Sequence, residues 1–426
     1  MRRWLKHWPW ALLAVLLLVP ATLVWLNVRD EDAIVDTPDV KGTAEQVARG
    51  EYLARAGDCM ACHTARGGQP YAGGRGIDTP FGIVFAPNIT PDKATGIGEW
   101  SPGHFWRALH NGRARDGRLL YPAFPYPNYT RVSREDADAL YFYLKSLPPV
   151  QQKNQPHALR FPYDSQIALG VWRALFFRPR HFEADPARSA VWDRGAYLVQ
   201  GLGHCNACHA ARNVLGATSG PTDLGGGLIA AQNWYAPALT WSPGEGGVAD
   251  WDAKDIVALL KHGVNGKAWV KGPMADVVLY STQYLNDADL HAMAIYLKAP
   301  VREDDERRRQ PAGEALLQHG AKLYATHCAK CHGDKGEGAP PAYPPLAGNR
   351  AVTMEPPANL VRMVLGGGFP PATAGNPRPY GMAPFAMVLS NDDISAVVTY
   401  VRTSWGNEGS MVSSFDVQRY REGSGP

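Results

Sequence analysis

Six cysteines are the residues in this sequence whose spacing indicates a definite chemistry. They occur only in three C-x-x-C-H strings, which begin at residues 59, 205 and 328. This spacing is the signature of c-type haem attachment, because two thiols three positions apart add to the two vinyl groups of one porphyrin. The histidine that follows then lies beneath the iron as its proximal ligand. The strings therefore predict three covalently bound haem c groups, attached through Cys59, Cys62, Cys205, Cys208, Cys328 and Cys331, with His63, His209 and His332 as iron ligands.

Two other chemistries use the same residue types. A structural zinc site would pair two C-x-x-C units into one tetrahedron, but these strings are more than a hundred residues apart and each is followed by histidine. A thioredoxin-like redox pair requires a βαβ context, and no such pattern surrounds the strings. No cysteine is left over for a disulfide framework. We therefore interpret all three strings as haem attachment sites.

Two methionines are the candidates for the sixth iron ligand, which Met supplies in many cytochromes c. Met382 stands in a Gly/Pro-rich segment shortly before Ser390, and Met274 stands at the matching place before Asn286. We expect both to ligate iron. The first repeat has Phe124 at this place, and phenylalanine cannot ligate iron. Its haem is therefore expected to have an open or water-filled distal side.

Four histidines outside the strings are weaker candidates. His104 is a possible sixth ligand of the first haem, whereas His110 aligns with Lys261 of the second repeat and is expected to cap a helix or bond a haem propionate. His204 and His327 each directly precede a cysteine of a string. The histidine of the string itself takes the proximal position, so these two are expected to be structural.

The elements that must position these residues are repeated three times. A helix leads into each string and is marked by matching segments, which are Arg49-Gly50-Glu51-Tyr52-Leu53, Arg194-Gly195-Ala196-Tyr197-Leu198 and His319-Gly320-Ala321-Lys322-Leu323. A second helix closes each repeat. It starts with a Ser or Asn N-cap and an acid three residues later, at Ser133 and Asp136, Asn286 and Asp289, and Ser390 and Asp393. Ten residues after each cap follows an aromatic and aliphatic pair that we expect to face the first helix, at Tyr143-Leu144, Tyr296-Leu297 and Tyr400-Val401.

This repetition predicts the domain organisation. We expect an all-α chain, with an N-terminal transmembrane helix followed by three tandem cytochrome c-type domains at residues 41–150, 191–300 and 312–405. Residues 151–190 form a Pro-rich linker in which Ile167 to Phe177 is expected to be a short apolar helix. A charge cluster from Arg302 to Arg309 reads as a solvated linker without further function. Residues 406–426 are assigned to a tail.

The N-terminus predicts a membrane anchor within residues 1–30. The apolar stretch from Trp8 to Leu26 is long enough to span a bilayer as a helix, and it lacks an A-x-A cleavage site. Arg2, Arg3 and Lys6 precede it, so the positive-inside rule leaves the N-terminus cytoplasmic. We therefore expect a single uncleaved anchor in the inner membrane, with the haem domains in the periplasm. A net charge of only +3 and the lack of a basic stripe argue against nucleic acid as a partner.

Several strings together resemble the three-haem cytochrome c subunits of bacterial membrane-bound dehydrogenases, over residues 45–407. Besides the helix segments above, the matching strings are Asp58-Cys59-Met60-Ala61-Cys62-His63-Thr64, Phe85-Ala86-Pro87-Asn88-Ile89-Thr90-Pro91 and Tyr400-Val401-Arg402-Thr403-Ser404-Trp405-Gly406-Asn407. Such subunits serve quinoprotein alcohol dehydrogenase and the flavin-dependent gluconate, sorbitol and fructose dehydrogenases. Similar ones accompany molybdopterin-containing aldehyde or heteroaromatic hydroxylases. The resemblance implies a non-catalytic subunit that takes electrons from a periplasmic dehydrogenase and passes them to ubiquinone or another respiratory acceptor.

Two departures from the resemblance bear on the partner. Phe124 replaces a methionine that alcohol dehydrogenase-type relatives have, and the uncleaved anchor differs from removable signals. Both features favour a molybdopterin enzyme as the partner. Two other functions stay open at this point. One is a free-standing, membrane-anchored electron carrier, and the other is a haem peroxidase-like enzyme that would use the first haem with His104 or His110 as its acid-base group.

Overall fold

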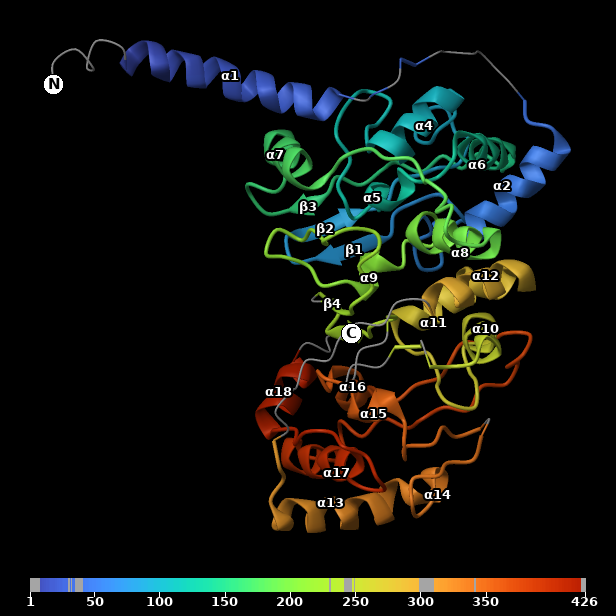
Figure 1. The fold of residues 1–426 in the computed structure, drawn as a ribbon, viewed down its shortest axis with the longest axis vertical. Helices are drawn as coiled ribbons and strands as arrows, with labels where there is room; N and C mark the ends of the chain where they lie inside the picture. Colours follow the sequence, from blue (N-terminus) through green and yellow to red (C-terminus); the bar gives the residue numbers. More distant parts are fainter. Residues whose placement is uncertain are drawn as a thin grey trace. The chain divides into compact units, whose positions relative to one another are not determined.

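Helices joined by long loops make up most of the chain in the computed structural model (Figure 1). The chain divides into two compact units, Met1–Glu51 with Cys62–Phe182, and Tyr52–Ala61 with Glu183–Pro426. The structure describes residues 8–29, 31, 33–34, 41–229, 231–240, 247–248, 250–298, 310–340 and 342–422.

The first compact unit combines helices with one small sheet. Its helices are α1 (Trp8–Val28), the first part of α2 (Ala44–Ala56), α4 (Pro102–Asn111), α5 (Tyr126–Tyr129), α6 (Arg134–Ser146) and α7 (Gln166–Phe176). The sheet is antiparallel, in the order β1 (Gly76–Thr79), β2 (Gly82–Phe85) and β3 (Ala158–Leu159). Its register pairs Ile77 with Val84 and Gly82 with Leu159.

The second compact unit contains the helices of the second and third repeats. The elements from residue 183 to 298 are α8 (Ala190–Gln200), α9 (Asn206–His209), β4 (Gly227–Ile229), β5 (Trp234–Ala236), α10 (Ala253–His262), α11 (Pro273–Tyr280), the 3₁₀ helix η2 (Thr282–Tyr284) and α12 (Asp287–Leu297). The elements after residue 310 are α13 (Glu314–His327), α14 (Ala329–His332), α15 (Arg350–Thr353), α16 (Ala358–Gly366), α17 (Asn391–Thr403) and α18 (Ser414–Glu422). The short helix α3 (Cys59–Cys62) crosses the boundary between the units.

The closing helices α6, α12 and α17 begin at the predicted caps. In each, the side chain of the N-cap residue accepts a hydrogen bond from the backbone amide of the aspartate three residues later, and the caps are Ser133, Asn286 and Ser390. The carboxylate of the same aspartate binds a basic side chain of the lead-in helix. These pairs are Arg49 with Asp136, Arg194 with Asp289 at 2.7 Å, and His319 with Asp393 at 2.7 Å. Each aspartate therefore donates the capping hydrogen bond at the start of its closing helix and also binds that helix to the lead-in helix.

A glycine on each lead-in helix lets the two helices of a repeat cross in close contact. A Cβ added at the glycine would lie 1.9, 2.0 or 2.2 Å from the carbonyl oxygen of an alanine on the closing helix, in the pairs Gly50 with Ala139, Gly195 with Ala292 and Gly320 with Ala396. The same glycines lie against the Cβ atoms of Tyr143, Tyr296 and Tyr400. The predicted orientation of these tyrosines toward the first helix is therefore confirmed.

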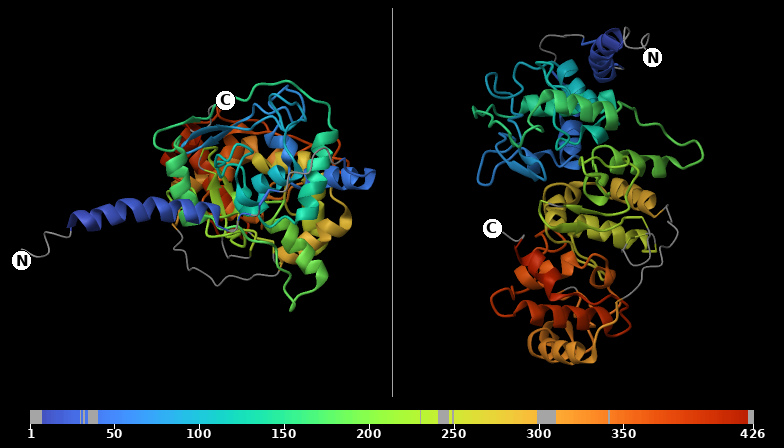
Figure 2. Two further views of the ribbon diagram at one scale, coloured as in Figure 1. Left: turned by 90° about the horizontal axis from the view of Figure 1, so that it is seen from above. Right: turned by 90° about the vertical axis from the view of Figure 1, so that its left-hand side faces the viewer.

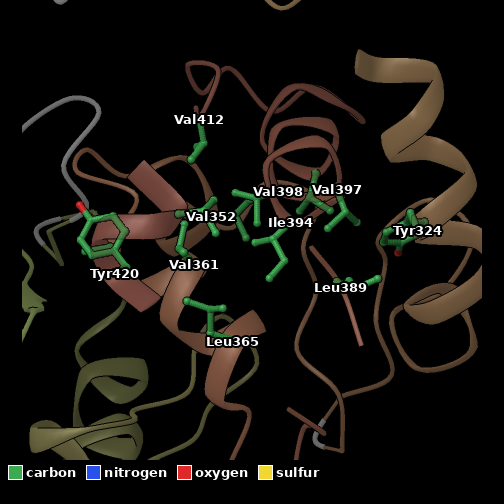
Figure 3. Packing of buried hydrophobic residues seen from close by; sticks show 13 residues of the cluster. Tyr324, Val352, Val361, Leu365, Leu389, Ile394, Val397, Val398, Val412 and Tyr420 are labelled. Carbon is green, nitrogen blue, oxygen red and sulfur yellow. The ribbon is translucent and has the colours of Figure 1, made fainter. Parts of the chain in front are cut away.

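The core of the third repeat lies between α16, α17 and α18. Figure 3 shows Ile394 and Val398 of α17 on the side of Val361 and Leu365 of α16, and Val397 on the side of Tyr324 of α13. All of them are at most 3% exposed, and each such aliphatic side chain contributes about 1.5–3 kcal/mol when fully buried. The right-hand view of Figure 2 shows the same helices, in orange and red, packed together.

Two expectations about secondary structure need correction. The chain is not all-α, because the described residues also form five short strands. These strands turn the loops that follow the first two C-x-x-C-H strings into hairpins, which fix the backbone close to the histidines. The segment 406–426 is not merely a tail, because it folds into α18, whose Val417 and Tyr420 are buried in the third core. The predicted apolar helix in the linker is confirmed as α7.

Helix α1 covers the stretch that was predicted to be a membrane anchor. However, none of the helices within the described ranges has the length and apolar character needed to cross a membrane. The basic residues Arg2, Arg3 and Lys6 and the charge cluster from Arg302 to Arg309 lie outside the described residues. The three predicted domain boundaries stay a prediction.

The glycine crossing yields a prediction about stability. Gly195→Ala should lower the free energy of unfolding by about 1–3 kcal/mol, because the new methyl group overpacks the contact with the Ala292 carbonyl. Calorimetry on the haem-loaded chain measures this. Gly170→Ala is the matched control, since Gly170 also lies inside a helix but a Cβ there would meet no atom closer than 3.7 Å. That control should be neutral or stabilising by about 0.5–1 kcal/mol. Equal effects of the two substitutions would contradict the close crossing.

Candidate haem sites

The histidine of each C-x-x-C-H string is held by a proline carbonyl. Its Nδ1 lies within hydrogen-bond distance of the carbonyl oxygen, in the pairs His63 with Pro87 at 2.8 Å, His209 with Pro237 at 2.7 Å and His332 with Pro344 at 3.1 Å. A carbonyl only accepts, so Nδ1 carries the hydrogen and Nε2 keeps its lone pair. This tautomer is the one that a metal-binding imidazole requires, and a carbonyl partner on the other nitrogen is a common way to orient such a ring.

The protonation of these histidines also suits a metal ligand. Burial lowers the pKa of His63, His209 and His332 below its ordinary value, and the proline carbonyl acts in the opposite direction more weakly. Since the lowered pKa favours the neutral imidazole, the lone pair on Nε2 is available at neutral pH.

A glycine positions the chain opposite each of these histidines. Its amide donates a hydrogen bond to the histidine carbonyl, in the pairs Gly73 to His63 at 2.8 Å, Gly226 to His209 at 2.9 Å and Gly338 to His332 at 2.8 Å. All three glycines have positive φ angles of 79°, 85° and 68°, where other residues are strained. At Gly73 and Gly338 an added Cβ would also lie 2.5 and 2.7 Å from the prolines that hold the rings, Pro87 and Pro344. Histidine, glycine and proline therefore form one repeated bracket.

None of the six cysteines forms a disulfide. The first cysteine of each string is partly buried, and the second, at residues 62, 208 and 331, is exposed. Burial raises the pKa of Cys205 to about 12 and that of Cys328 to about 11. Redox-active C-x-x-C pairs depend on a lowered thiol pKa, so these two thiols do not have that character.

Within the described ranges, no group of three or more His, Cys, Asp and Glu side chains is arranged to hold a bare metal ion. A c-type haem does not need such a group, because the porphyrin supplies most of the iron ligands and the protein adds only the axial ones. The residues present fit this cofactor: a pair of thiols stands beside a neutral imidazole whose free nitrogen is fixed in orientation.

The structure places the candidate sixth-ligand positions before the closing helices, as the sequence indicates. Met274 is not in a loop as expected but in the first turn of α11, because Pro273 starts that helix. Met382 lies in an extended segment that pairs with Gly368 through two backbone hydrogen bonds of 2.8 Å each. Phe124 lies in the turn before α5, where its ring packs edge-on against Tyr129 at 5.3 Å. Ligation by the two methionines stays a prediction.

The other histidines have structural surroundings. His104 belongs to the capping box of α4, with Nδ1 2.7 Å from the Ser101 hydroxyl. His110, in the last turn of α4, is buried, and its ring stacks with those of Trp106 and His181 at centroid distances of 4.5 and 4.6 Å. The stacking partner His181 was not predicted, because it belongs to the linker and no motif marks it.

The two histidines that precede a cysteine also have defined surroundings. His204 adopts a positive φ of 38°, and burial lowers its pKa. His327 ends α13, and its ring lies 5.9 Å from that of Phe385.

A buried arginine of α17 is a further residue that sequence reasoning missed. Arg402 is fully buried, forms an ion pair with Glu355, and donates from Nη1 to the carbonyls of Val352 at 2.8 Å and Met354 at 2.9 Å. It thereby fixes the loop between α15 and α16. The signal was a single charge on an otherwise apolar helix face, which alone does not distinguish a buried arginine from a solvated one.

Comparison with known proteins agrees with this geometry. The family model of cytochrome c matches residues 47–148 and 317–405. The cytochrome c subunit of alcohol dehydrogenase (quinone) from Gluconacetobacter polyoxogenes is 39% identical over 92% of this chain and 87% of its own length. The gluconate 2-dehydrogenase cytochrome c subunit of Pantoea cypripedii is 36% identical over 96% of this chain and 95% of its own. A nicotinate dehydrogenase subunit from Pseudomonas putida is 39% identical over 91% of this chain and 32% of its own. The chain therefore belongs to the family of cytochrome c subunits of dehydrogenases.

Proposed function

We propose that this chain is an electron-transfer subunit with three covalent c-type haems. It would take electrons from a catalytic dehydrogenase partner and pass them to ubiquinone or another respiratory acceptor. The observation that carries the proposal is the bracket of histidine, proline carbonyl and glycine amide, which recurs at all three C-x-x-C-H strings. The names of the relatives support the dehydrogenase partner.

The protein's own residues have separate tasks in this function. Haem iron supplies the chemistry when bound, because it accepts and releases one electron without changing its ligands. The six cysteines fix the porphyrin covalently. The proline carbonyls hold the histidine rings, and the helix crossings place each string against its closing helix. We infer that Met274 and Met382 serve as sixth ligands, since a soft sulfur ligand raises the reduction potential.

The surroundings of His104 and His110 do not favour a haem peroxidase-like function. A peroxidase-like role would need an acid-base group at the first haem, but His104 Nδ1 is engaged in a helix cap and His110 is buried against the rings of Trp106 and His181. The relatives do not separate the classes of partner, since proteins of alcohol dehydrogenase (quinone) and of nicotinate dehydrogenase are both 39% identical to this chain. A molybdopterin enzyme therefore stays one prediction for the partner.

Location in the periplasm, attached to the inner membrane, is part of the proposal and rests on the sequence. The C-x-x-C-H strings support this location, because in bacteria c-type haems are attached to proteins in the periplasm. Cell fractionation tests it directly, because haem-containing protein in the cytoplasmic fraction would contradict this location.

The haem number is the first prediction of this function. Protein from a host that matures cytochromes c should hold three haems per chain that resist acid-acetone extraction. It should also be reduced by its co-purified dehydrogenase when that enzyme's substrate is added. Cys205→Ala with Cys208→Ala should leave two haems per chain. Extractable haem, or fewer than three in the wild type, would refute the haem assignment, whereas three haems without a co-purified partner would favour a free-standing carrier.

The sixth ligands give the next prediction. Met274→Ala and Met382→Ala should each lower the potential of one haem, by on the order of 0.1 V within the roughly 0.8 V range that axial ligands span. Each should also weaken the near-infrared band of Met-ligated ferric iron. Met387→Ala is the matched control, because Met387 is 97% exposed and should change neither property. Unchanged spectra and potentials in both ligand variants would show that these methionines do not bind iron.

Phe124 leads to the opposite expectation for the first haem. Its iron should be high-spin or weakly ligated, should bind carbon monoxide or cyanide, and should have the lowest potential of the three. Phe124→Met should supply a sulfur, abolish that binding and raise the potential. Paramagnetic resonance of the oxidised wild type distinguishes this from closure by His104, because three low-spin signals without a high-spin one would exclude the open site.

A further inference from the structure

Two segments that carry the candidate methionine ligands meet within the second compact unit. The first comprises residues 262–274, between the end of α10 and the start of α11, and the second comprises residues 367–382. We call their contact the methionine junction. Its parts fit closely, since a Cβ added at Gly263 would lie 2.5 Å from Pro371, and one added at Gly375 would lie 2.1 Å from the ring of His262. Thr373 also donates its hydroxyl hydrogen to the His262 carbonyl at 3.1 Å.

A second set of contacts keeps the junction in register. Asn359 of α16 bonds both backbone groups of Tyr235 in β5, at 2.9 and 2.7 Å. Beside it, the guanidinium of Arg362 lies 4.8 Å from the centre of the Trp234 ring. The same strand leads into Pro237, whose carbonyl orients His209. The third repeat therefore contacts the second repeat in two places. One is the strand that leads to Pro237 and His209, and the other is the segment that carries Met274.

One charged group inside the junction lacks a counter-charge. The ammonium of Lys271 is buried and has no hydrogen-bond partner among the residues that the structure describes. It occupies the space that a side chain at position 368 would need, because a Cβ on Gly368 would lie 1.8 Å from Nζ. Gly368 in turn holds Met382 by its two backbone hydrogen bonds. Lys271 thus precedes Met274 by three residues in its own repeat, just before α11 begins, and its Nζ reaches the Gly368 backbone that pairs with Met382 of the next repeat.

An unpaired charge at this place has a predictable effect. Reduction of haem iron removes one positive charge, so a nearby ammonium favours the reduced state and raises the potential. The effect is strong when the charge is shielded from water, because the local dielectric constant is low. Burial lowers the pKa of Lys271 to about 8, so the ammonium is still mostly charged at pH 7.

We propose that Lys271 adjusts the reduction potentials used in electron transfer: its buried positive charge lies at the methionine junction, next to both segments that carry a candidate iron ligand, and raises the potential of the second and third haems. This inference rests on the proposed function, because it needs haems at those two strings. It assigns to a residue of the second repeat an influence on the third. Because the same charge raises both potentials, both sites accept electrons more readily, while the difference between their potentials changes little.

Redox titration of the haem-loaded chain tests the proposal at pH 7. Lys271→Met should shift to lower values the haem component that Met274→Ala identifies and the one that Met382→Ala identifies, while the first haem stays unchanged. The shift should persist at high salt, since a buried charge is poorly screened. Lys267→Met is the matched control, because Lys267 is half-exposed and paired with Asp255 at 2.8 Å. It should leave all three potentials in place.

The outcomes separate the inference from the function on which it rests. A chain with three haems whose potentials do not move in Lys271→Met, or move only for the second repeat, would overturn the proposal and leave the proposed function standing. A wild-type chain without three haems would instead remove the proposed function. If Lys271→Met fails to fold, Lys271→Gln removes the same charge with a polar side chain and should give the same shift.

Discussion

Close crossing of two helices at a glycine is the contact on which each repeat depends. Gly50, Gly195 and Gly320 admit an alanine carbonyl at a distance that no Cβ would tolerate. The aspartate three residues after the cap of the closing helix then binds the lead-in helix one residue before the glycine, at Arg49, Arg194 or His319. The glycine contact and the neighbouring aspartate pair therefore both fix the position at which the two helices cross. Because the C-x-x-C-H string follows directly on the lead-in helix, this crossing determines where the cysteines stand.

From the crossing, the orientation of the histidine follows in two further steps. The string itself forms a single helical turn, α3, α9 or α14, and its histidine lies at the end of that turn or directly after it, next to the following loop. That loop must return close enough for its proline carbonyl to meet Nδ1. A glycine with positive φ makes this approach possible and at the same time closes a hydrogen bond to the histidine carbonyl. The geometry of the loop and the tautomer of the imidazole therefore depend on the same glycine, and a side chain at Gly73 or Gly338 would disturb both.

Sequence alone predicts the parts of this arrangement that depend on neighbouring residues. The N-caps at Ser133, Asn286 and Ser390 are local hydrogen bonds between a side chain and the next turn, so their pattern is visible in the chain. The strands could not be predicted, because they pair over short runs such as Gly227–Ile229 without an apolar alternation of their own. Helix α18 and the burial of Arg402 depend on contacts with segments far away in the chain. The helical setting of Met274 was missed because Gly272-Pro273 reads equally as a loop and as a helix start.

Arg402 and Lys271, two cations of the second compact unit, differ in a way that bears on their function. Arg402 is fully compensated, since Glu355 supplies a negative charge and three carbonyl oxygens accept its remaining N–H groups. A neutralised group of this kind fixes a loop but produces little field at a distance. Lys271 has no such partners among the described residues, so its charge acts on whatever redox group lies nearby. Burying an unpaired ammonium is unfavourable for stability. The neighbouring Lys267, by contrast, is paired with Asp255. An acidic side chain beside Lys271 would lower the free-energy cost of burying the ammonium, but it would also cancel the electrostatic field of that charge. A lysine without such a partner is therefore the arrangement that raises the potentials of the second and third haems.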